Sequence, residues 1–463
     1  MNAIILSAIW GVVLMFCSVL IKNKGVYRHI AALGLLVILA GNIHETYHGS
    51  FFNIDTHEML RFSRFGLFFN TILLAATLLY VLLSGRDVEK AGGYVAEYFT
   101  LIFFVLCGAS ILTSFNTLLM LFIGIEILSI PLYILTGSDK RNLRSNEAAL
   151  KYFLMGAFST GILLMGIALV YGGTGSFMLE VPRSAIMGGY KGVSFLEVTG
   201  LLFLLVAMSF KVSAAPFHFW TPDVYDGAPS VFTSFMATIV KAAAFAAFLK
   251  LFEARVGDTS AAVDWKLLLS IIIVSTLLIG NVTAVFQQSV KRMLAYSSIA
   301  QAGFMLFAVF SLNDVAKEGL LLYATAYSLA TIGVFAVLIK MKDVTFEGFN
   351  GLARKNPVLA ATTTICLLSL AGIPLTAGFF AKFSMLSAVI KTGTYTWLVV
   401  VAVLFAAVSA YYYFRVIQAM YFKEGDAQTE EVTGGFKVLL IAVAALVILF
   451  GVQPQALLNW FYF

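Results

Sequence analysis

The sequence predicts an all-α membrane protein that crosses the bilayer about fourteen times. Of its 463 residues, 60% are hydrophobic and only 12% are charged, whereas soluble globular chains carry about 25% charged residues. Its apolar runs are continuous over about 20 residues, the length of a membrane-spanning helix, whereas barrel strands would alternate in polarity. The formal net charge of +6 therefore indicates basic cytoplasmic loops rather than nucleic-acid binding.

The predicted spans follow one another with short loops between them. The first span has no preceding basic residue and no cleavage-site pattern, so we expect a retained helix. The longest predicted loop, 172–193, is rich in glycine and turn residues, and no soluble domain fits between the spans. The spans lie within 3–21, 29–44, 62–84, 95–113, 116–137, 147–172, 196–217, 230–252, 265–287, 297–312, 317–340, 358–391, 395–422 and 437–461. The second and the tenth are the short ones.

Two of these spans are predicted to be broken. Residues 358–391 would form a straight helix of about 50 Å, against a hydrocarbon core of about 30 Å. They contain the segment A-G-I-P-L-T-A-G with Pro374, which cannot donate its amide to the helix. The seventh span runs into S-F-K-V-S-A-A-P-F-H-F-W, where Pro216 is the breaker. We therefore expect two half-helices in each.

Broken helices at corresponding places indicate repeated halves, a common design in transporters. We expect four parts along the chain. Residues 1–94 hold three N-terminal spans, 95–253 and 264–422 hold five spans each, and 436–463 hold the last span. The two five-helix parts are expected to be repeated halves.

Basic residues predict the orientation, because cytoplasmic loops carry an excess of lysine and arginine. The odd-numbered loops are the richer ones, and Lys140, Arg141 and Arg144 illustrate the bias. The even-numbered loops hold fewer, among them Arg183 and Lys191. The odd-numbered loops are therefore expected in the cytoplasm and both termini on the outer side.

Four charged residues lie deep inside apolar segments: Glu126, Lys211, Lys241 and Lys382. A charge near the bilayer centre costs roughly 2.5–3.5 kcal/mol on insertion scales, and such residues usually mark ion or proton pathways. Helix packing does not repay this cost. The pattern therefore predicts that these side chains move charge.

Glu126 and Lys151 are a candidate acid–base pair between the fifth and sixth spans. Moving either charge of such a pair would alter the protonation of the other group. Lys151 also follows Glu147 by four residues, so a local helical pair competes with the cross-helix pair. Lys151 could instead extend its ammonium to the membrane interface, and Glu126 could be a protonated acid that bonds a neighbouring helix.

The other candidates lie near the predicted breaks. Lys211 precedes Pro216 by five residues, and His218 follows it as a candidate relay because histidine changes charge near neutral pH. Lys241 has alanine neighbours that leave room for water and for a close helix. Lys382 lies beyond the second break.

Several further polar residues have less distinct expected roles. Ser297, Ser298 and Gln301 are expected to wet a half-channel, and Arg415 to reach the interface or to end the pathway. Lys250 is expected to reach the interface, Lys291 and Arg292 to mark orientation, Asp223 and Asp226 to cap a turn, and Tyr411–Tyr413 to lie at the interface. The chain has no Walker loop, dinucleotide fingerprint or haem motif, and Cys17, Cys107 and Cys366 are isolated, which predicts no bound cofactor, nucleotide or metal.

At these residues the chain resembles the antiporter-like membrane subunits of respiratory complex I. The resemblance is carried by K-V-S-A-A-P-F-H-F-W-T-P-D-V-Y-D-G-A-P at 211–229, I-V-K-A-A at 239–243, K-R-M-L-A-Y-S-S-I-A-Q-A-G at 291–303 and L-A-G-I-P-L-T-A-G-F-F-A-K-F at 370–383. It covers roughly 95–422. Within this family, the chain is most similar to the N-type subunits of bacterial NADH:quinone oxidoreductases, because it has a lysine, Lys382, at the twelfth-helix position.

The resemblance implies a fold of two inverted five-helix repeats and a proton-translocating subunit coupled to quinone reduction elsewhere. It implies other membrane-arm subunits and the lipid bilayer as partners, no nucleic acid, and a bacterial cytoplasmic (inner) membrane location. NADH, FMN, iron–sulfur clusters and quinone are expected in partner subunits. The relay residues it implies are Glu126, Lys151, Lys211, His218, Lys241 and Lys382.

The D-type subunit of multi-subunit sodium/proton antiporters shares these motifs and is the alternative function. A third interpretation is an assembly scaffold whose charges only pair helices.

Overall fold

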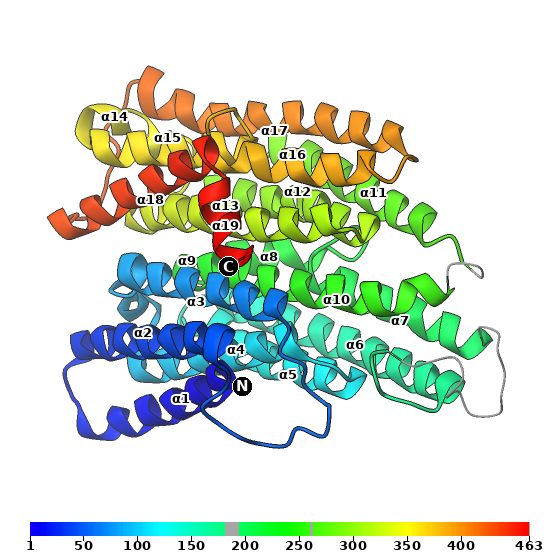
Figure 1. Cartoon of the computed structure of the whole chain (residues 1–463). Helices are drawn as coiled ribbons and strands as arrows, with labels where there is room; N and C mark the ends of the chain where they lie inside the picture. The colour runs from blue at the N-terminus through cyan, green and yellow to red at the C-terminus, as the bar shows by residue number, and fades with distance from the viewer. Residues whose placement is uncertain (181–193, 260–262, 463) are drawn as a thin grey trace.

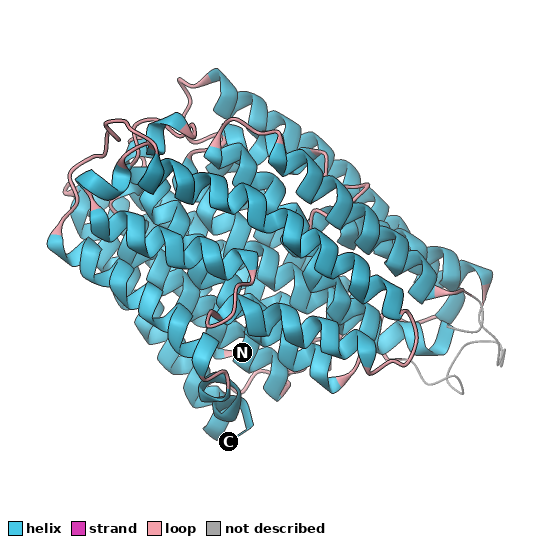
Figure 2. Ribbon diagram, turned by 90° about the horizontal axis from the view of Figure 1, so that it is seen from above, coloured by secondary structure: helices cyan, strands magenta, loops and turns pink. Residues whose placement is uncertain are grey.

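The computed structural model describes residues 1–180, 194–259 and 263–462, and there the protein is a bundle of helices that run side by side (Figures 1 and 2). Arg183 and Lys191, used above for orientation, lie outside the described residues. Within the described part, twelve helical stretches are long and apolar enough to cross a membrane. They are α1 (Asn2–Leu20), α2 (Lys24–His48), α3 (Arg64–Ser84), α4 (Val95–Ser114), α5 (Leu118–Thr136), α6 (Leu143–Thr174), Ser230–Val256, α11 (Trp265–Val285), α12 (Val290–Ser311), α13 (Asp314–Lys340), α17 (Thr396–Phe422) and α18 (Gly434–Val452).

Both predicted helix breaks are present. The seventh crossing consists of α7 (Phe195–Lys211) and the short helix α8 (Trp220–Gly227). The twelfth consists of α15 (Pro357–Ala371) and α16 (Ala377–Ile390). With these two broken helices, the described crossings agree with the predicted all-α, polytopic fold.

The eighth crossing contains a feature that the sequence did not predict. It starts with α9 (Ser230–Phe235), continues through the π-helical turn η3 (Met236–Val240), and ends with α10 (Lys241–Thr259). π-helical turns are rare and occur frequently at functional sites. Lys241 is the first residue after this turn.

Several element boundaries differ from the predicted ones. The second and tenth crossings were expected to be short, but α2 has 25 residues and α12 has 22. Their polar first turns escape a search for apolar runs, whereas the side chains of Asn23 and Ser289 cap them by accepting a backbone N–H. The last predicted span is two helices, α18 and α19 (Gln455–Tyr462), because Pro454 follows Gln453, whose backbone (φ −131°, ψ 72°) is not helical.

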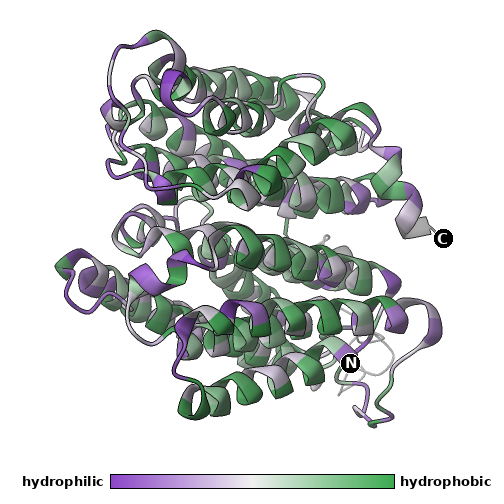
Figure 3. Ribbon diagram, turned by 90° about the vertical axis from the view of Figure 1, so that its left-hand side faces the viewer, coloured by the Kyte–Doolittle hydropathy of each residue, from purple (hydrophilic) through white to green (hydrophobic). Residues whose placement is uncertain are grey.

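Lys241 lies on one of the most enclosed helical stretches, whereas Glu126 on α5 and Lys151 on α6 lie on helices whose apolar windows are 50% and 33% buried. The apolar windows of Ser230–Val256 and of α12 are 94% buried, and that of α13 is 89% buried, whereas those of α1 and α17 are only 22% and 28% buried. Hydrophobic residues dominate the helices, while hydrophilic residues gather toward loops and helix ends (Figure 3). The bundle therefore has a central layer that holds buried polar groups and a periphery that is apolar.

Candidate functional site

Lys211 ends α7 at the first break and contacts α5. Its ammonium donates a hydrogen bond to the hydroxyl of Ser129, which is buried. Ser129 lies one helical turn after Glu126 on α5. A cavity of about 10 Å³, close to the least that holds one water molecule, is lined by Lys211, Ser129 and Thr160 among others. Lys211 is thus joined to the helix that carries Glu126.

Glu126 is bonded to Thr160 on α6. The Thr160 hydroxyl donates to Glu126 Oε1 at 2.8 Å. Thr160 also lines the cavity beside Lys211, so the Glu126 carboxylate is joined through one hydroxyl to the small space that Lys211 lines. The predicted pair between Glu126 and Lys151 is wrong in this structure. The physical reason is that Lys151 precedes Thr160 by nine residues, about 14 Å along α6.

Lys151 instead binds two carboxylates nearer the helix end. Its ammonium lies 2.8 Å from Glu147 Oε1 and 2.8 Å from Asp223 Oδ2. The local i,i+4 alternative is therefore present, together with a partner on α8. Asp223 was expected to cap a turn; its carboxylate instead accepts from both Lys151 and Arg292, the latter at 3.0 Å.

Two consecutive residues of α12 hold the short helix α8. Arg292 reaches Asp223 and lies 3.7 Å from Asp226. The neighbouring Lys291 is buried and donates to the carbonyls of Asp226 at 2.7 Å and Ala228 at 2.6 Å. These are terminal carbonyls that the helix itself leaves without partners. Beyond marking a basic loop, this pair fixes the second half of the broken helix.

Lys241 is 2% exposed and contacts α12 and α8. Its ammonium donates to the Ser298 carbonyl at 2.8 Å and to the Ser298 hydroxyl at 3.0 Å. It also lies 5.8 Å from the ring centroid of Tyr225. No carboxylate pairs with Lys241 in the described residues, so neutral oxygen atoms and an aromatic face surround the amine.

Lys382 binds back to the end of the helix half that precedes the second break. Its ammonium donates to the carbonyls of Leu370 at 2.9 Å and Ala371 at 3.0 Å. It lies 4.6 Å from the centroid of the Phe304 ring. Helix C-termini attract cations because their last carbonyls lack helical partners. The break therefore creates the binding site for the lysine that follows it.

Polar side chains on α12 lie between Lys241 and Lys382. Gln301 Nε2 donates to the Leu370 carbonyl at 2.9 Å and to the Tyr413 hydroxyl at 3.1 Å. The Tyr323 hydroxyl donates to Gln301 Oε1, and Ser297 shares a hydrogen bond with Tyr413. A second cavity of about 10 Å³ is lined by Gln301, Tyr323 and Lys382 among others. The Leu370 carbonyl is thus a common acceptor for Gln301 and Lys382.

His218 lies in the first break and is 5% exposed. Its Nδ1 atom is buried and has no hydrogen-bond partner in the described part of the chain. The hydroxyls of Ser213 and Thr221 in the same region are likewise buried without partners. Buried polar atoms of this kind are usually satisfied by ordered water. The structure does not join His218 directly to the other five predicted site residues.

Two expectations for surrounding residues need correction, those for Lys250 and for Tyr411–Tyr413. Lys250 does not reach the interface: its ammonium is buried, lacks a hydrogen-bond partner in the described residues, and lies 5.1 Å from the Phe115 ring centroid, because the apolar window of Ser230–Val256 is 94% buried. Arg415 donates to the Val285 carbonyl at 2.6 Å and so caps α11. Tyr412 and Tyr413 are buried rather than interfacial, whereas Tyr411 is exposed.

One buried ion pair outside this region was not anticipated. Lys340, at the end of α13, lies 2.7 Å from both oxygens of Asp87 in the 3-10 helix η1 (Asp87–Ala91). Lys90 also contacts Asp87 and Glu430. Burial alone would lower the pKa of Lys90, but its hydrogen bonds to these two carboxylates hold the pKa above its ordinary value. This cluster joins the end of α13, the 3-10 helix η1 and the loop before α18.

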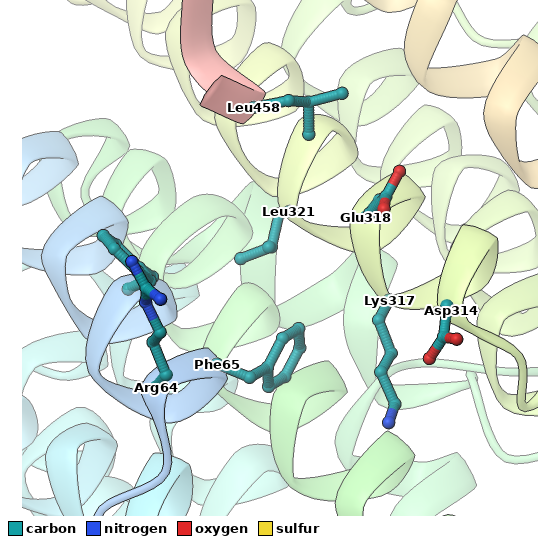
Figure 4. Close-up of a pocket in the computed structure, with 8 residues that line it drawn as sticks. Arg64, Phe65, Asp314, Lys317, Glu318, Leu321 and Leu458 are labelled. Carbon is teal, nitrogen blue, oxygen red and sulfur yellow. The ribbon is translucent and has the colours of Figure 1, made fainter. Parts of the chain in front are cut away.

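A larger cavity lies apart from the charged line, between α3, α13 and α19 (Figure 4). It has a volume of about 390 Å³, and both signs of charge line it, with Arg64 and Lys317 opposite to Asp314 and Glu318 in sign. None of the six predicted site residues is among its lining residues. Lys317 is paired with Glu253 of α10. The cavity is therefore separate from the candidate relay.

Comparisons with known proteins place this geometry in a family. Residues 115–409 match the family described as NADH:quinone oxidoreductase/Mrp antiporter, TM. The NADH-quinone oxidoreductase subunit N of Cytophaga hutchinsonii is 40% identical, with 99% of each chain covered. The subunit N of Flavobacterium psychrophilum is 37% identical, with 99% of this chain and 100% of the relative covered.

Solved structures agree. A chain of respiratory complex I from Thermus thermophilus with bound aureothin has a TM-score of 0.85 and 32% identity, covering 99% of this chain and 98% of that chain. A chain of the Mrp complex from Dietzia sp. DQ12-45-1b has a TM-score of 0.83 at 17% identity, with 99% and 95% covered, which shows a shared fold alone. The identity over the full chain confirms the resemblance to complex I membrane subunits, and the chain belongs to the NADH-quinone oxidoreductase subunit N family.

Proposed function

We propose that this chain translocates protons as a membrane-arm subunit of an NADH:quinone oxidoreductase. The observation that carries the proposal is the sequence of buried contacts from Lys241 through α12 to Lys382. Lys241 binds Ser298, and Gln301, one turn later, shares the Leu370 carbonyl with Lys382. Buried amines surrounded by neutral acceptors are suited to exchanging protons, because no carboxylate holds them permanently charged.

The roles we propose differ between the two halves. In the first half, Lys211 lines a cavity to which Glu126 is joined through Thr160, so a proton that arrives on either charged group alters the field at the other. In the second half, Lys241 and Lys382 hold protons in turn. His218, in the first break, relays protons between water chains.

Lys151 is proposed as the group nearest the entrance. It lies on the first part of α6, close to the basic loop that contains Lys140 and Arg141, and one of its two carboxylate partners, Glu147, is exposed. Protons would enter from the cytoplasm, load Lys241 and Lys211 through buried water, and pass toward Lys382. Both termini are proposed to lie on the periplasmic side of the bacterial inner membrane.

The chain needs partners for this activity. The redox reaction is proposed to occur in other subunits that hold NADH, FMN, iron–sulfur clusters and quinone, and to drive the membrane-arm cycle electrostatically. The relay would be built on the two five-helix repeats 95–253 and 264–422, each with its own broken helix. Nothing in this proposal requires a cofactor on this chain.

The test replaces Lys211 or Lys241 by alanine in the assembled complex and measures protons moved per electron transferred. We expect fewer protons per electron in both variants, with assembly checked on native gels. Undiminished pumping in both would overturn the proposed roles. A scaffold role predicts the reverse: poor assembly, but normal pumping in the complexes that do form.

A cation/proton antiporter subunit is the second candidate, favoured by the fold shared with the Mrp complex chain. The two functions predict different partners. Purification of the tagged chain from its native membrane should recover redox subunits if it acts in an NADH:quinone oxidoreductase. Recovery of antiporter subunits without redox subunits would favour the alternative.

A further inference from the structure

The largest of the described cavities lies away from the relay, at the end of the bundle where α2 and α18 begin (Figure 1). It has a volume of about 590 Å³, within the range of small-molecule binding sites. Residues near the start of α2, the end of α3 and the start of α18 line it. Because three membrane-spanning helices begin or end here, the cavity lies at the membrane boundary on the side predicted to face the cytoplasm.

Two arginines give this cavity a positive charge. Arg28 and Arg86 line it, and neither forms an ion pair within the described residues; Arg28 has only a 3.3 Å hydrogen bond with the His29 ring. Lys340 also lines the cavity, but Asp87 neutralises it at 2.7 Å. Glu431 is the acidic side chain of the lining. The positive charge of the two guanidinium groups therefore exceeds the negative charge of Glu431 in the cavity lining.

The start of α18 adds uncovered backbone amides. Thr433 caps this 19-residue helix, and Thr433 and Gly435 line the cavity. A side chain built on Gly434 or Gly435 would meet no atom within 4 Å, so the first turn is open to a ligand. Helix N-termini favour anions because their first N–H groups lack helical partners. The amides and the arginines thus select the same kind of ligand.

The remaining wall is apolar and continues onto the surface of the bundle. Leu82 and Val438 line the cavity and are 40% and 65% exposed. Phe436 and Leu439 complete this wall. A soluble anion would gain nothing from such a surface, whereas acyl chains would cover it. Basic pockets between membrane helices on the cytoplasmic side are suited to anionic lipid headgroups.

We propose that Arg28, Arg86 and the first turn of α18 bind the phosphodiester headgroup of an anionic phospholipid, whose acyl chains lie along Leu82 and Val438. Arginine suits this role because its planar group forms two parallel hydrogen bonds to phosphate oxygens. The site is independent of the proposed proton relay. Its expected consequence is that α18 is held to α2 and α3 by lipid as well as by protein contacts.

The test uses the intact complex in nanodiscs with a photoactivatable phosphatidylglycerol, and the labelled peptides are mapped by mass spectrometry. We expect labelling within 28–32 and 433–439 that unlabelled phosphatidylglycerol displaces, while phosphatidylcholine and inorganic phosphate do not. Competition by inorganic phosphate would indicate a site for free anions. Equal competition by phosphatidylcholine would show that the site does not select anionic lipids. Either result would overturn the proposal, and so would labelling confined to other peptides.

Matched variants sharpen the test. The double variant R28Q/R86Q should lower labelling roughly a hundredfold, since each of the two lost charged hydrogen bonds weakens binding about tenfold. The control R141Q/R354Q removes two exposed arginines outside the cavity and should label as the unmodified complex does. Glu431→Gln should increase labelling. If R28Q/R86Q assembles and labels normally, the proposal is wrong; if it does not assemble, the mapping in the unmodified complex decides.

Discussion

Lys151 and Asp223 form an ion pair at 2.8 Å that joins α6 to the second half of the broken seventh helix. Arg292 of α12 contacts the same carboxylate at 3.0 Å. Three elements from different parts of the sequence therefore meet at one acidic group. Glu126, the partner predicted for Lys151, is bonded to Thr160 instead. The pair places Lys151 near the end of the bundle, where a proton could enter.

Asp223→Asn should lower the number of protons moved per electron and have only a small effect on the free energy of unfolding. The side chains of Lys151 and Asp223 are 38% and 37% exposed and that of Arg292 is 34% exposed, so each of the two lost ion pairs should lower the free energy of unfolding by less than about 1 kcal/mol. Thermal unfolding of the complex checks this. If Lys151 is the entry group, protons moved per electron should fall. Asp226→Asn is the control, since Asp226 contacts Arg292 only at 3.7 Å; equal pumping in both variants would contradict the entry role.

Gln301→Leu should interrupt the path between Lys241 and Lys382. The variant removes the groups that bond the Leu370 carbonyl, Tyr413 and Tyr323. We expect assembly to persist and acidification to decline in inverted membrane vesicles. Gln287→Leu serves as the comparison, because among the described residues the side chain of Gln287, just beyond α11, bonds only the Thr283 carbonyl. Normal acidification in Gln301→Leu would show that protons bypass this residue.

Gly372→Ala should disturb Lys382 without altering its chemistry. Gly372 has a φ of +85°, and an added Cβ would lie 2.8 Å from Lys382 Cδ. Left-handed backbone on a non-glycine residue costs about 1–3 kcal/mol. Gly393→Ala imposes similar backbone strain, with a φ of +72°, but meets no atom within 4 Å. Pumping should therefore fall in Gly372→Ala alone; loss in neither variant would argue against a fixed Lys382 position.

Thr160→Val tests the contact between Glu126 and α6. The substitution keeps the shape of the side chain but removes the hydroxyl that donates to Glu126. An unmatched acceptor costs about 1–3 kcal/mol when it is buried, and less here because Glu126 is partly exposed. We expect a lower pumping rate with normal assembly. Thr199→Val, on an exposed site of α7, is the control, and identical rates would make the Thr160 contact irrelevant.

The fold was largely predictable because the membrane imposes it. Continuous apolar runs gave the crossings, and Pro216 and Pro374 gave both breaks. The predicted helix boundaries were wrong where a helix begins with polar residues, as in α2 and α12, since a search for apolar runs leaves these residues out. The π-helical turn before Lys241 could not be foreseen, because the sequence M-A-T-I-V of Met236–Val240 is equally compatible with an ordinary α-helix.

The site was predictable as a set of residue types but not as a set of contacts. Glu126, Lys211, Lys241 and Lys382 stood out because a charge in an apolar run is costly. The hydrogen-bond partners of these residues could not be predicted, since they depend on how far along each helix the residues lie. The cross-helix partner of Lys151 failed for this reason. Lys291 was undervalued because its position in a basic loop hid its binding to α8 carbonyls.

Proton pumping by Lys241→Ala and Lys250→Ala tests the central claim most directly. Both lysines lie on α10 and both ammonium groups are buried, but only Lys241 contacts α12 and the polar groups that lead to Lys382. The measurement is protons moved per electron in the reconstituted complex, with NADH oxidation followed in parallel. The relay predicts a lower ratio in Lys241→Ala and an unchanged ratio in Lys250→Ala. An unchanged ratio in Lys241→Ala would contradict it.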